Sequence, residues 1–294
     1  MNTSIENVVV DILICNYNTR DLVKPMVDCV EASRPKPKIN YLVIDNASAD
    51  GSGPYIRQAY PNMHLIENTK NVGFGRANNQ LLDWVTAEYV LLLNTDAFVS
   101  PDTLAKSIEF MQAHPECGIL GVKLVSRDGA LQPSCRYFPT PWNTFLARTG
   151  LAKYTPWVRM ADDLSWGHDS PRECDWVPGC YYLTRKAVID KVGLFDPRFF
   201  LYYEEVDHCR RVKQAGWKVY FYPDTSVVHI GGESAKSAGS ITESGRQLSA
   251  LQTESELLYI RKHHGLMGLL SHVALSLTFE ALTILKSAIT LSQP

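Results

Sequence analysis

Residues 89–104, YVLLLNTDAFVSPDTL, contain a buried strand, an acidic strand end and the start of a helix. The apolar run 89–93 has the length and composition of a strand that is covered on both faces. Asn94, Thr95 and Asp96 follow without a break, and Ser100 with Pro101 predicts a helix that runs to about residue 113. A strand that passes through polar residues into a helix is typical of α/β proteins. The segment raises the question of why an acid stands at the end of a buried strand.

The composition sets limits on the class of protein. The chain has 294 residues, of which 45% are hydrophobic, enough for one large α/β domain. A net charge of -2 gives no electrostatic footprint for nucleic acid. The seven cysteines are scattered and form no C-x-x-C pair, which indicates free thiols in a reducing compartment and argues against a zinc site. No basic segment precedes the first apolar run, so we expect no signal peptide.

The alternation of strand and helix patterns extends along the chain and predicts an α/β fold with a mostly parallel central sheet flanked by helices. Strands are expected at 8–15, 41–45, 63–67, 89–93, 176–183 and 218–222, and helices at 20–32, 77–85, 100–113, 184–192 and 204–215. Residues 126–175 carry five prolines and are expected to be irregular.

Polar residues follow three of the expected strands. The first strand ends in Asn16 and Asn18, the second in Asp45, Asn46 and Ser48, and the strand 89–93 in Asn94 and Asp96. Any one such group could cap a helix or make a turn. Because ligands of α/β sheets bind at the carboxyl ends of the strands, three groups together predict a binding site.

Seven blocks of sequence carry a resemblance to a known family. They are ILICNYN (12–18), VIDNASADGS (43–52), ENTKNVGFGRANN (67–79), LLLNTDA (91–97), WVPGCYYLTRKAV (176–188), GLFDPRFFLYYEEVDHCRR (193–211) and VVHIGGES (227–234). In this order they resemble family 2 glycosyltransferases, and more specifically bacterial rhamnosyltransferases of cell-surface polysaccharide synthesis. The resemblance implies a GT-A fold, with a nucleotide-sugar-binding half at 1–100, an acceptor and catalytic half at 101–240, and a helical extension at 241–294. It implies transfer of a sugar from a nucleoside diphosphate sugar to an acceptor hydroxyl, with inversion.

The implied reaction explains the acid at the strand end. The leaving group is a diphosphate, and a divalent cation, Mn²⁺ or Mg²⁺, can neutralise the charge that develops on it. Such cations bind oxygen ligands, and Mn²⁺ also accepts imidazole. Asp96 is expected to be one ligand, and by resemblance His229 completes the site. Asn94 stands where the family's Asp-x-Asp motif often has its first Asp. Members of the rhamnosyltransferase type frequently have Asn at this position too, and the Asn removes one negative charge.

An inverting displacement also needs a base for the acceptor hydroxyl. By resemblance to the family's Glu-Asp pair the base is Glu205, and Glu204 is the alternative. The spacing of Asp207 and Arg211 indicates a structural ion pair on one helix face.

The remaining expectations concern the two substrates. Asp45 resembles the residue that contacts the base or ribose of the nucleotide, and Asn16, Asn18, Asn46 and Ser48 are expected to line the same pocket. Gly73, Arg76 and Asn78 are expected near the donor, where backbone donors close to a helix start suit a phosphate. Trp176 and Gly179 resemble the acceptor-side block, although Trp176 could equally be a core residue.

The C-terminal segment predicts a helix with one polar stripe and a wide apolar face. The stripe comprises His272, Ser276, Glu280, Thr283 and Ser287. A charged residue in mid-span disfavours a transmembrane helix. Residues 266–291 are therefore expected to lie on a membrane surface or to pack against the protein or a second copy, with the basic cluster 261–264 suited to anionic headgroups. We expect the protein in the cytoplasm, and on the inner face of the plasma membrane if this helix lies on the membrane surface.

Four functions remain open from the sequence. The first is transfer of rhamnose from dTDP-rhamnose to a glycan or polyprenyl-linked glycan, and the second uses a UDP-hexose donor on the same fold. The third is a non-catalytic protein that binds nucleotide sugars, which the intact Asp96, Glu205 and His229 disfavour. The fourth, a nucleotidyltransferase, would need a Gly-rich loop with Arg or Lys after the first strand, and CNYNTRD (15–21) lacks it.

Overall fold

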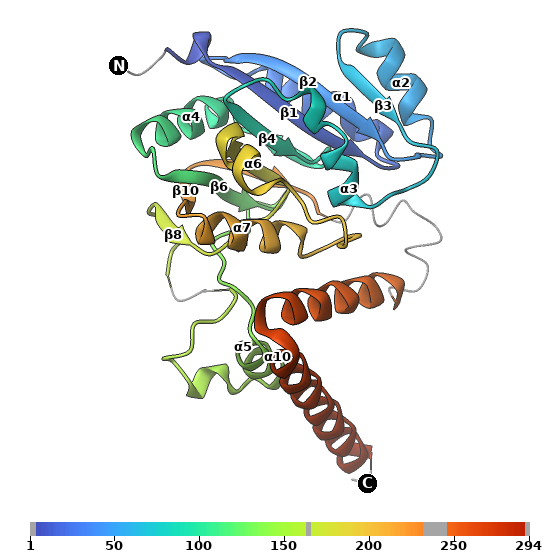
Figure 1. Cartoon of the computed structure of the whole chain (residues 1–294), viewed down its shortest axis with the longest axis vertical. Coiled ribbons are helices and arrows are strands. Elements are labelled where there is room, and N and C mark those ends of the chain that lie inside the picture. Colours follow the sequence, from blue (N-terminus) through green and yellow to red (C-terminus); the bar gives the residue numbers. More distant parts are fainter. Residues whose placement is uncertain (1–3, 163–165, 232–245, 292–294) are drawn as a thin grey trace.

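The computed structural model describes residues 4–162, 166–231 and 246–291, which form one mixed sheet with helices on both faces (Figure 1). The main path of the sheet runs in the order β3-β2-β1-β4-β9-β6-β10-β5, with β7 beside β6 and β8 beside β10. The strands are β1 Val9–Asn16, β2 Lys38–Asp45, β3 His64–Glu67, β4 Tyr89–Leu93, β5 Ala97–Val99, β6 Cys117–Val125, β7 Leu131–Gln132, β8 Arg172–Cys174, β9 Tyr181–Arg185 and β10 Lys218–His229.

The helices join these strands and extend the chain at its C-terminal end. They are α1 Arg20–Glu31, α2 Ser52–Ala59, α3 Phe74–Asn79, α4 Thr103–Ala113, α5 Pro141–Thr149, α6 Lys186–Val192, α7 Glu204–Gln214 and α10 Arg246–Leu291. Short 3-10 turns occupy η1 Ile5–Asn7, η2 Leu82–Trp84 and η3 Leu151–Tyr154.

Burial on both faces explains the uninterrupted apolar strands. Val10, Ile12 and Ile14 of β1 point into one core, whereas Leu13 points into the other. Successive side chains of a strand alternate between faces, so both sets must be apolar when helices cover both sides. The parallel N-terminal strands β3, β2, β1 and β4 and the flanking helices confirm the predicted α/β class.

Two predicted helices have different bounds. The helix expected at 77–85 begins earlier, at Phe74, because Gly73 adopts a positive φ of 89° and turns the chain into the helix. A side chain at Gly73 would collide with the carbonyl oxygen of Phe200, so the position requires glycine. The helix expected from Ser100 begins at Thr103, since the Ser100 hydroxyl donates to Ser226 O instead of capping.

Two predicted strands also have different bounds in the structure. The strand expected at 176–183 begins only at Tyr181, because Pro178 and Gly179 favour a turn. Thr184, where a helix was expected to begin, lies inside β9 and donates to Gly118 O at 2.9 Å, and the helix α6 begins at Lys186. The strand expected at 218–222 continues to His229 through a register shift that accommodates Pro223.

The segment expected to be irregular contains a helix, α5. Thr140 accepts a hydrogen bond from the backbone N–H of Asn143, the Asn143 side chain accepts one from the backbone of Thr140, and Pro141 occupies the first turn. This capping box stabilises a helix within a proline-rich stretch. In Figure 1, α5 lies beside α10, and the two helices pack together.

Helix α10 has two arms that meet at Gly265, whose φ of 69° breaks the helical backbone. The docked arm, 246–264, packs on the α/β fold through buried Tyr259 and Ile260. The projecting arm, 266–291, points away from the sheet (Figure 1). A stretch of Ala250–Ser287 is long and apolar enough to cross a membrane by length and composition, with a mean hydropathy of 1.5.

The polar stripe predicted on the projecting arm faces the protein where the arm is in contact with it. His272 is buried, and its Nε2 lies 3.7 Å from Glu256 Oε1. The apolar face consequently points outward, and Met267 and Leu277 are 77% and 65% exposed.

Candidate active site

The polar ends of β1 and β2 form one hydrogen-bonded network. Asp45 is buried, and its Oδ1 accepts hydrogen bonds from Asn16 Nδ2 at 2.7 Å and from Ser48 Oγ at 2.6 Å. Ser48 Oγ accepts a further bond from the backbone N–H of Asn18 at 2.9 Å. The strands pair in parallel up to Asn16 and Asp45, which places their ends side by side. The structure thus brings together four of the residues expected at the nucleotide.

Two threonines connect this network to the end of β4. Thr19 Oγ1 donates to Asn16 Oδ1 at 2.8 Å and lies 2.8 Å from Thr95 Oγ1. Since the single hydroxyl hydrogen of Thr19 goes to Asn16, Thr95 is the donor of the second bond. Both threonines are buried, and Thr95 immediately precedes Asp96. Sequence reasoning missed them, although Thr95 lies inside the motif that was singled out.

Asn46 supports a neighbouring loop. Its amide donates to Asn71 Oδ1 at 2.8 Å, and its Oδ1 accepts from Asn68 Nδ2 and from the backbone N–H of Val72. These bonds hold the segment that leads to Gly73. The buried side chain of Asn46 therefore positions the loop expected near the donor phosphates.

The other donor-side residues are more dispersed. Arg76 is exposed and donates to Pro197 O, whereas Asn78 is buried and donates to Phe74 O. The Oδ1 atom of Asn78 has no hydrogen-bond partner. Asn94 is half-buried, and its backbone N–H donates to Cys180 O at 3.0 Å.

Asp96 and His229 come together across two strands. Residues 97–99 pair antiparallel with the end of β10, so His229 stands beside the residue that follows Asp96. Its Nε2 lies 3.7 Å from Asp96 Oδ1, and its Nδ1 lies 3.0 Å from Gln132 Oε1. An amide oxygen accepts, so Nδ1 carries the proton and Nε2 keeps its lone pair. Burial lowers the pKa of His229, although the Asp96 carboxylate opposes the shift, which favours the neutral ring.

This pair fits a divalent cation by the chemistry of its donor atoms. One carboxylate and one neutral imidazole suit Mn²⁺, and such ions complete their coordination with water and substrate phosphates. Among the described residues no cluster of three or more His, Cys, Asp or Glu side chains could hold a metal ion. The protein would therefore supply two ligands at this point. Gly232, the next residue of the motif after Gly231, lies outside the described residues.

Glu204 and Glu205 begin α7 in different environments. Glu204 is buried, and a Cβ at Gly75 would stand 3.6 Å from the Cβ of Glu204. Glu205 is half-buried and lies against Gly179 on the side expected for the acceptor. One carboxylate oxygen of each is buried without a hydrogen-bond partner.

These environments separate the two carboxyl groups electrostatically. Burial and the charge of Glu205 raise the pKa of Glu204 well above its usual value. Burial also raises the pKa of Glu205, but hydrogen bonds from the backbone and the positive charge of Arg136 lower it and so oppose this shift. Two interacting carboxyl groups titrate as a pair, and the better stabilised one ionises first. The geometry therefore favours Glu205 as the ionised member.

The backbone before α7 is strained. Tyr202 and Tyr203 both adopt left-handed conformations, with φ of 69° and 68°. This costs roughly 1–2 kcal/mol for each non-glycine residue. Tyr203 packs against Tyr259 of the docked arm, with ring centroids 5.5 Å apart, which helps hold the turn.

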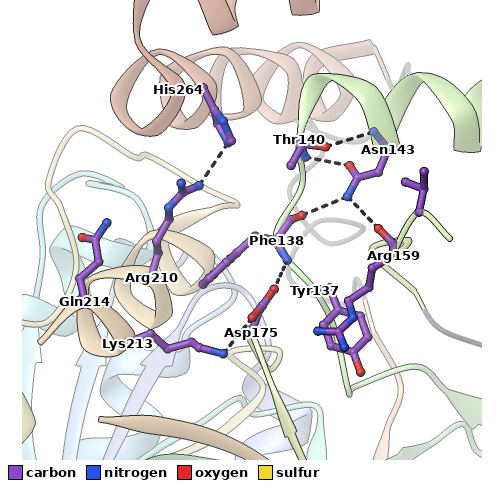
Figure 2. Close-up of a pocket in the computed structure, with 11 residues that line it drawn as sticks. Tyr137, Phe138, Thr140, Asn143, Arg159, Asp175, Arg210, Lys213, Gln214 and His264 are labelled. Carbon is purple, nitrogen blue, oxygen red and sulfur yellow. Dashed lines mark hydrogen bonds and ion pairs between the residues drawn. The ribbon is translucent and has the colours of Figure 1, made fainter. Parts of the chain in front are cut away.

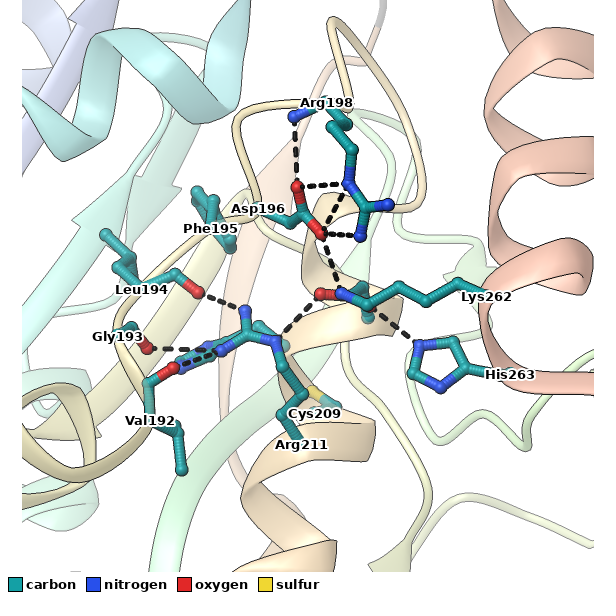
Figure 3. Close-up of polar contacts among 12 residues, drawn as sticks. Val192, Gly193, Leu194, Phe195, Asp196, Arg198, Cys209, Arg211, Lys262 and His263 are labelled. Carbon is teal, nitrogen blue, oxygen red and sulfur yellow. Dashed lines mark hydrogen bonds and ion pairs between the residues drawn. The ribbon is translucent and has the colours of Figure 1, made fainter.

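Helix α7 is also anchored by charges. Buried Asp207 accepts hydrogen bonds from Arg211 Nε at 2.8 Å and His263 Nε2 at 2.7 Å, and Lys262 Nζ lies 2.5 Å away. Figure 3 shows Lys262 reaching between the docked arm and Asp196. The predicted structural pair of Asp207 and Arg211 is confirmed, and it belongs to a larger cluster that joins α7 to α10.

The acceptor-side block gives a mixed result. Gly179 borders Glu205, as described above. Trp176 is only 8% exposed, its Nε1 donates to Tyr137 O at 3.0 Å, and Arg136 covers its ring at 4.8 Å. This burial favours the core role that the sequence left open and disfavours direct stacking on a sugar. Arg136 was missed, because its contact with Trp176 spans forty residues of sequence.

Comparisons with known proteins show the family of the chain. The chain matches the model of glycosyl transferase family 2 over residues 11–161 and that of glycosyl transferase family group 2 over residues 89–290. It is 28% identical, over 77% of its length and 76% of the relative, to N-acetylglucosaminyl-diphospho-decaprenol L-rhamnosyltransferase of Mycobacterium tuberculosis. It is 24% identical to rhamnosyltransferase WbbL of Escherichia coli, over 77% of its length and 85% of that protein.

A solved structure shares the fold. This is a mannosyltransferase from Pyrobaculum calidifontis in complex with GDP-Man and Mn²⁺, with a TM-score of 0.53 and 18% identity over 97% of this chain and 81% of that one. The chain belongs to glycosyl transferase family 2, its fold is of the GT-A type, and it is a glycosyltransferase.

Proposed function

We propose that this family 2 glycosyltransferase moves L-rhamnose from dTDP-rhamnose to a hydroxyl of a polyprenyl-linked glycan, with inversion, in cell-surface polysaccharide synthesis. The observation that carries the donor sugar is the likeness to an L-rhamnosyltransferase over three quarters of both chains. The name of that relative also gives a diphospho-decaprenol acceptor, which supports a lipid-linked acceptor here. Residues 1–240 would form the transferase domain and 241–294 its helical extension.

The donor nucleotide would bind over the ends of β1, β2 and β4. Asp45, held by Asn16 and Ser48, would contact the base or ribose. Gly73 at the start of α3 and the orphan Oδ1 of Asn78 would face the sugar and diphosphate part of the donor. Asn18, Asn46, Arg76 and Asn94 complete the proposed donor set.

Asp96 and His229 would hold a divalent cation, Mn²⁺ or Mg²⁺. When bound, the cation would neutralise the charge that develops on the leaving diphosphate. The neutral His229 ring, fixed by Gln132, presents its Nε2 lone pair beside the carboxylate.

Glu205 would act as the base. It accepts the proton of the acceptor hydroxyl while the hydroxyl oxygen bonds to the anomeric carbon and the bond from that carbon to the diphosphate oxygen breaks. The nucleoside diphosphate leaves, and the configuration at the anomeric carbon inverts. Burial and the charge of Glu205 raise the pKa of Glu204 more strongly, so Glu204 would be the protonated member of the pair. Its neutral carboxyl group would limit the negative charge at the donor.

Calorimetric binding of dTDP and UDP, each with and without Mn²⁺, tests the proposal. Metal-dependent binding of dTDP in preference to UDP is the expected result. A preference for UDP would replace the donor with a UDP-hexose, and binding of neither would favour the non-catalytic alternative.

The outward apolar face of the projecting arm supports attachment to the inner face of the plasma membrane. Exposed Met267, Leu270 and Leu277 would enter the boundary between headgroups and acyl chains, with the helix lying in the surface. Packing of the same face against a second copy of the chain is the alternative, and sedimentation of the detergent-free protein would reveal it.

A further inference from the structure

A cavity lined by none of the proposed donor residues lies where the transferase fold meets α5 and the kink of α10. Its volume is about 620 Å³. Figure 2 shows that Arg210 and Lys213 reach it from α7, Arg159 from the segment after η3, and His264 from the end of the docked arm. None of these residues belongs to the proposed donor or catalytic set.

The lining is cationic. Lys213 is neutralised by Asp175, whose Oδ1 lies 2.8 Å from its Nζ. Within the described part of the chain, neither Arg159 nor Arg210 lies within 4.0 Å of a carboxylate. Arg210 instead donates to Tyr259 Oη and His264 Nε2, and Arg159 stacks on the Tyr137 ring at 4.2 Å. Two guanidinium groups therefore line the cavity without a carboxylate partner among the described residues.

The cavity wall is preorganised. Buried Asn143 donates through Nδ2 to Phe138 O at 3.1 Å and to Arg159 O at 3.2 Å. These bonds hold the Arg159 backbone against the start of α5, whose N-terminal end adds positive potential. A guanidinium group suits phosphate oxygens, which accept two parallel hydrogen bonds from its fork.

Exposed apolar residues lie close in sequence to two of the lining residues, Arg159 and His264. Trp157, two residues before Arg159, is 79% exposed. Leu266 and Met267, which follow His264 and Gly265, are 54% and 77% exposed and begin the outward face of the projecting arm. A ligand with an anionic head and an apolar chain would match both parts of this surface.

The cavity also adjoins the catalytic region. Glu205 and Arg210 are five residues apart on α7, a rise of about 7.5 Å. Arg136 directly precedes the lining residues Tyr137 and Phe138. It exchanges backbone hydrogen bonds with Asp175 and Trp176 and lies near Glu205. One acceptor molecule could therefore contact both places.

We propose that this cavity binds the diphosphate of the polyprenyl-linked acceptor, with Arg159 and Arg210 as its ligands and the lipid chain along the projecting arm. The proposal rests on the lipid-linked acceptor of the proposed function. It assigns the acceptor's anionic group to a site separate from the donor diphosphate.

The test is calorimetry on the full-length protein with farnesyl diphosphate, a short polyprenyl diphosphate, as the ligand. Arg159→Gln and Arg210→Gln should each weaken its binding by about tenfold to a hundredfold, since a charge-assisted hydrogen bond contributes about 1.5–3 kcal/mol. Arg261→Gln, which removes an exposed charge from α10, the helix that carries His264, is the matched control and should change little. Binding of dTDP should be unchanged in all three variants, which also shows that they fold.

Three further ligands separate the possible sources of phosphate. Inorganic diphosphate should bind at least tenfold more weakly than farnesyl diphosphate, and farnesol should not compete. Vesicles of phosphatidylglycerol and phosphatidylcholine should bind wild type and Arg159→Gln equally. Equal affinity for inorganic diphosphate, loss of vesicle binding in Arg159→Gln, or unchanged farnesyl diphosphate binding in both variants would each overturn the proposal. Failure of the wild type to bind dTDP or UDP would refute the proposed function instead, whatever happens at this cavity.

Discussion

Replacing Asp207 by Asn should weaken the attachment of α10 to the transferase fold. The substitution keeps the size of the side chain and removes the charge that holds Arg211, Lys262 and His263 together (Figure 3). The carboxylate is fully buried. Because α10 also covers the turn at Tyr203 and forms one wall of the cationic cavity, the change should be felt at both.

The size of the effect follows from the ionisation of the carboxyl group. Burial alone would raise the pKa of Asp207, but the hydrogen bonds from His263, Lys262 and Arg211 lower it to about 2. Relative to an ordinary Asp this corresponds to about 2 kcal/mol of stabilisation at pH 7. Removing one partner of a buried ion pair costs about 3–5 kcal/mol. Since Lys262 keeps Asp196 as a partner, we expect about 3 kcal/mol for Asp207→Asn.

The pH dependence has a definite sign. A carboxyl group whose pKa is lowered in the folded protein contributes its full stabilisation above the unfolded pKa, near 4, and loses it as the pH falls through about 2. The difference in unfolding free energy between wild type and Asp207→Asn should therefore be constant from pH 7 to about 5. About half of the ionisation contribution should be lost by about pH 3.

Urea unfolding followed by tryptophan fluorescence at pH 7, 5, 4 and 3 would measure this difference. Asp190→Asn is the matched control, because Asp190 forms an exposed ion pair with Lys186 on α6 and such pairs contribute about 0.5 kcal/mol or less. A loss below about 1 kcal/mol in Asp207→Asn at pH 7, or a difference that does not shrink toward pH 3, would show that the cluster does not hold the helix as argued.

Three further predictions concern catalysis, metal binding and the membrane. Glu205→Gln should keep dTDP binding and lower the rate of transfer by about 10²–10⁴-fold, with a smaller effect for Glu204→Gln; the reverse order in a nucleotide-release assay would make Glu204 the base. Asp96→Asn should raise the Mn²⁺ concentration needed for half-maximal dTDP binding by at least about tenfold, corresponding to about 1.4 kcal/mol, and His229→Gln should do the same, whereas unaltered metal titrations would remove both from the metal site. Leu270→Glu should reduce sedimentation with anionic vesicles by about tenfold, since burying a charge opposes insertion; undiminished binding would argue for the packed alternative.

The periodic parts of the fold were predictable because burial on two faces leaves a plain signal. Strands such as β1 and β4 are nearly continuous apolar runs, and their bounds were predicted to within a residue or two. The errors fell where local backbone geometry overrides periodicity. Gly73 moved the start of α3, and Pro178 with Gly179 delayed β9. Helix α5 had a readable signal that was passed over, since Thr140 and Pro141 are an N-cap followed by a first-turn proline.

Some residues of the candidate site could likewise be predicted from the sequence, and others could not. Residues at strand ends could be grouped from sequence, because parallel strands place their carboxyl ends at one edge. The residues that support them from distant parts of the chain could not be predicted in this way. Gln132 meets His229 across 97 residues, and Arg136 lies against Trp176 and near Glu205 only because the segment before α5 folds back along β8. Such contacts depend on how loops cross the sheet, which no local pattern specifies.

The orientation of the projecting arm shows the same limit and has a consequence for function. Periodicity predicted a polar stripe and an apolar face but could not say which would meet the protein. Glu256 settles it, because this buried carboxylate accepts from Arg148 of α5 at 3.3 Å and attracts His272 on the projecting arm. A polar contact therefore fixes the orientation of the helix, and its apolar face remains exposed. A globular protein whose helix served only its own core would bury the opposite face. An outward apolar face, together with two arginines that have no carboxylate partner among residues 4–162, 166–231 and 246–291, is the arrangement expected when the acceptor itself is an amphiphile.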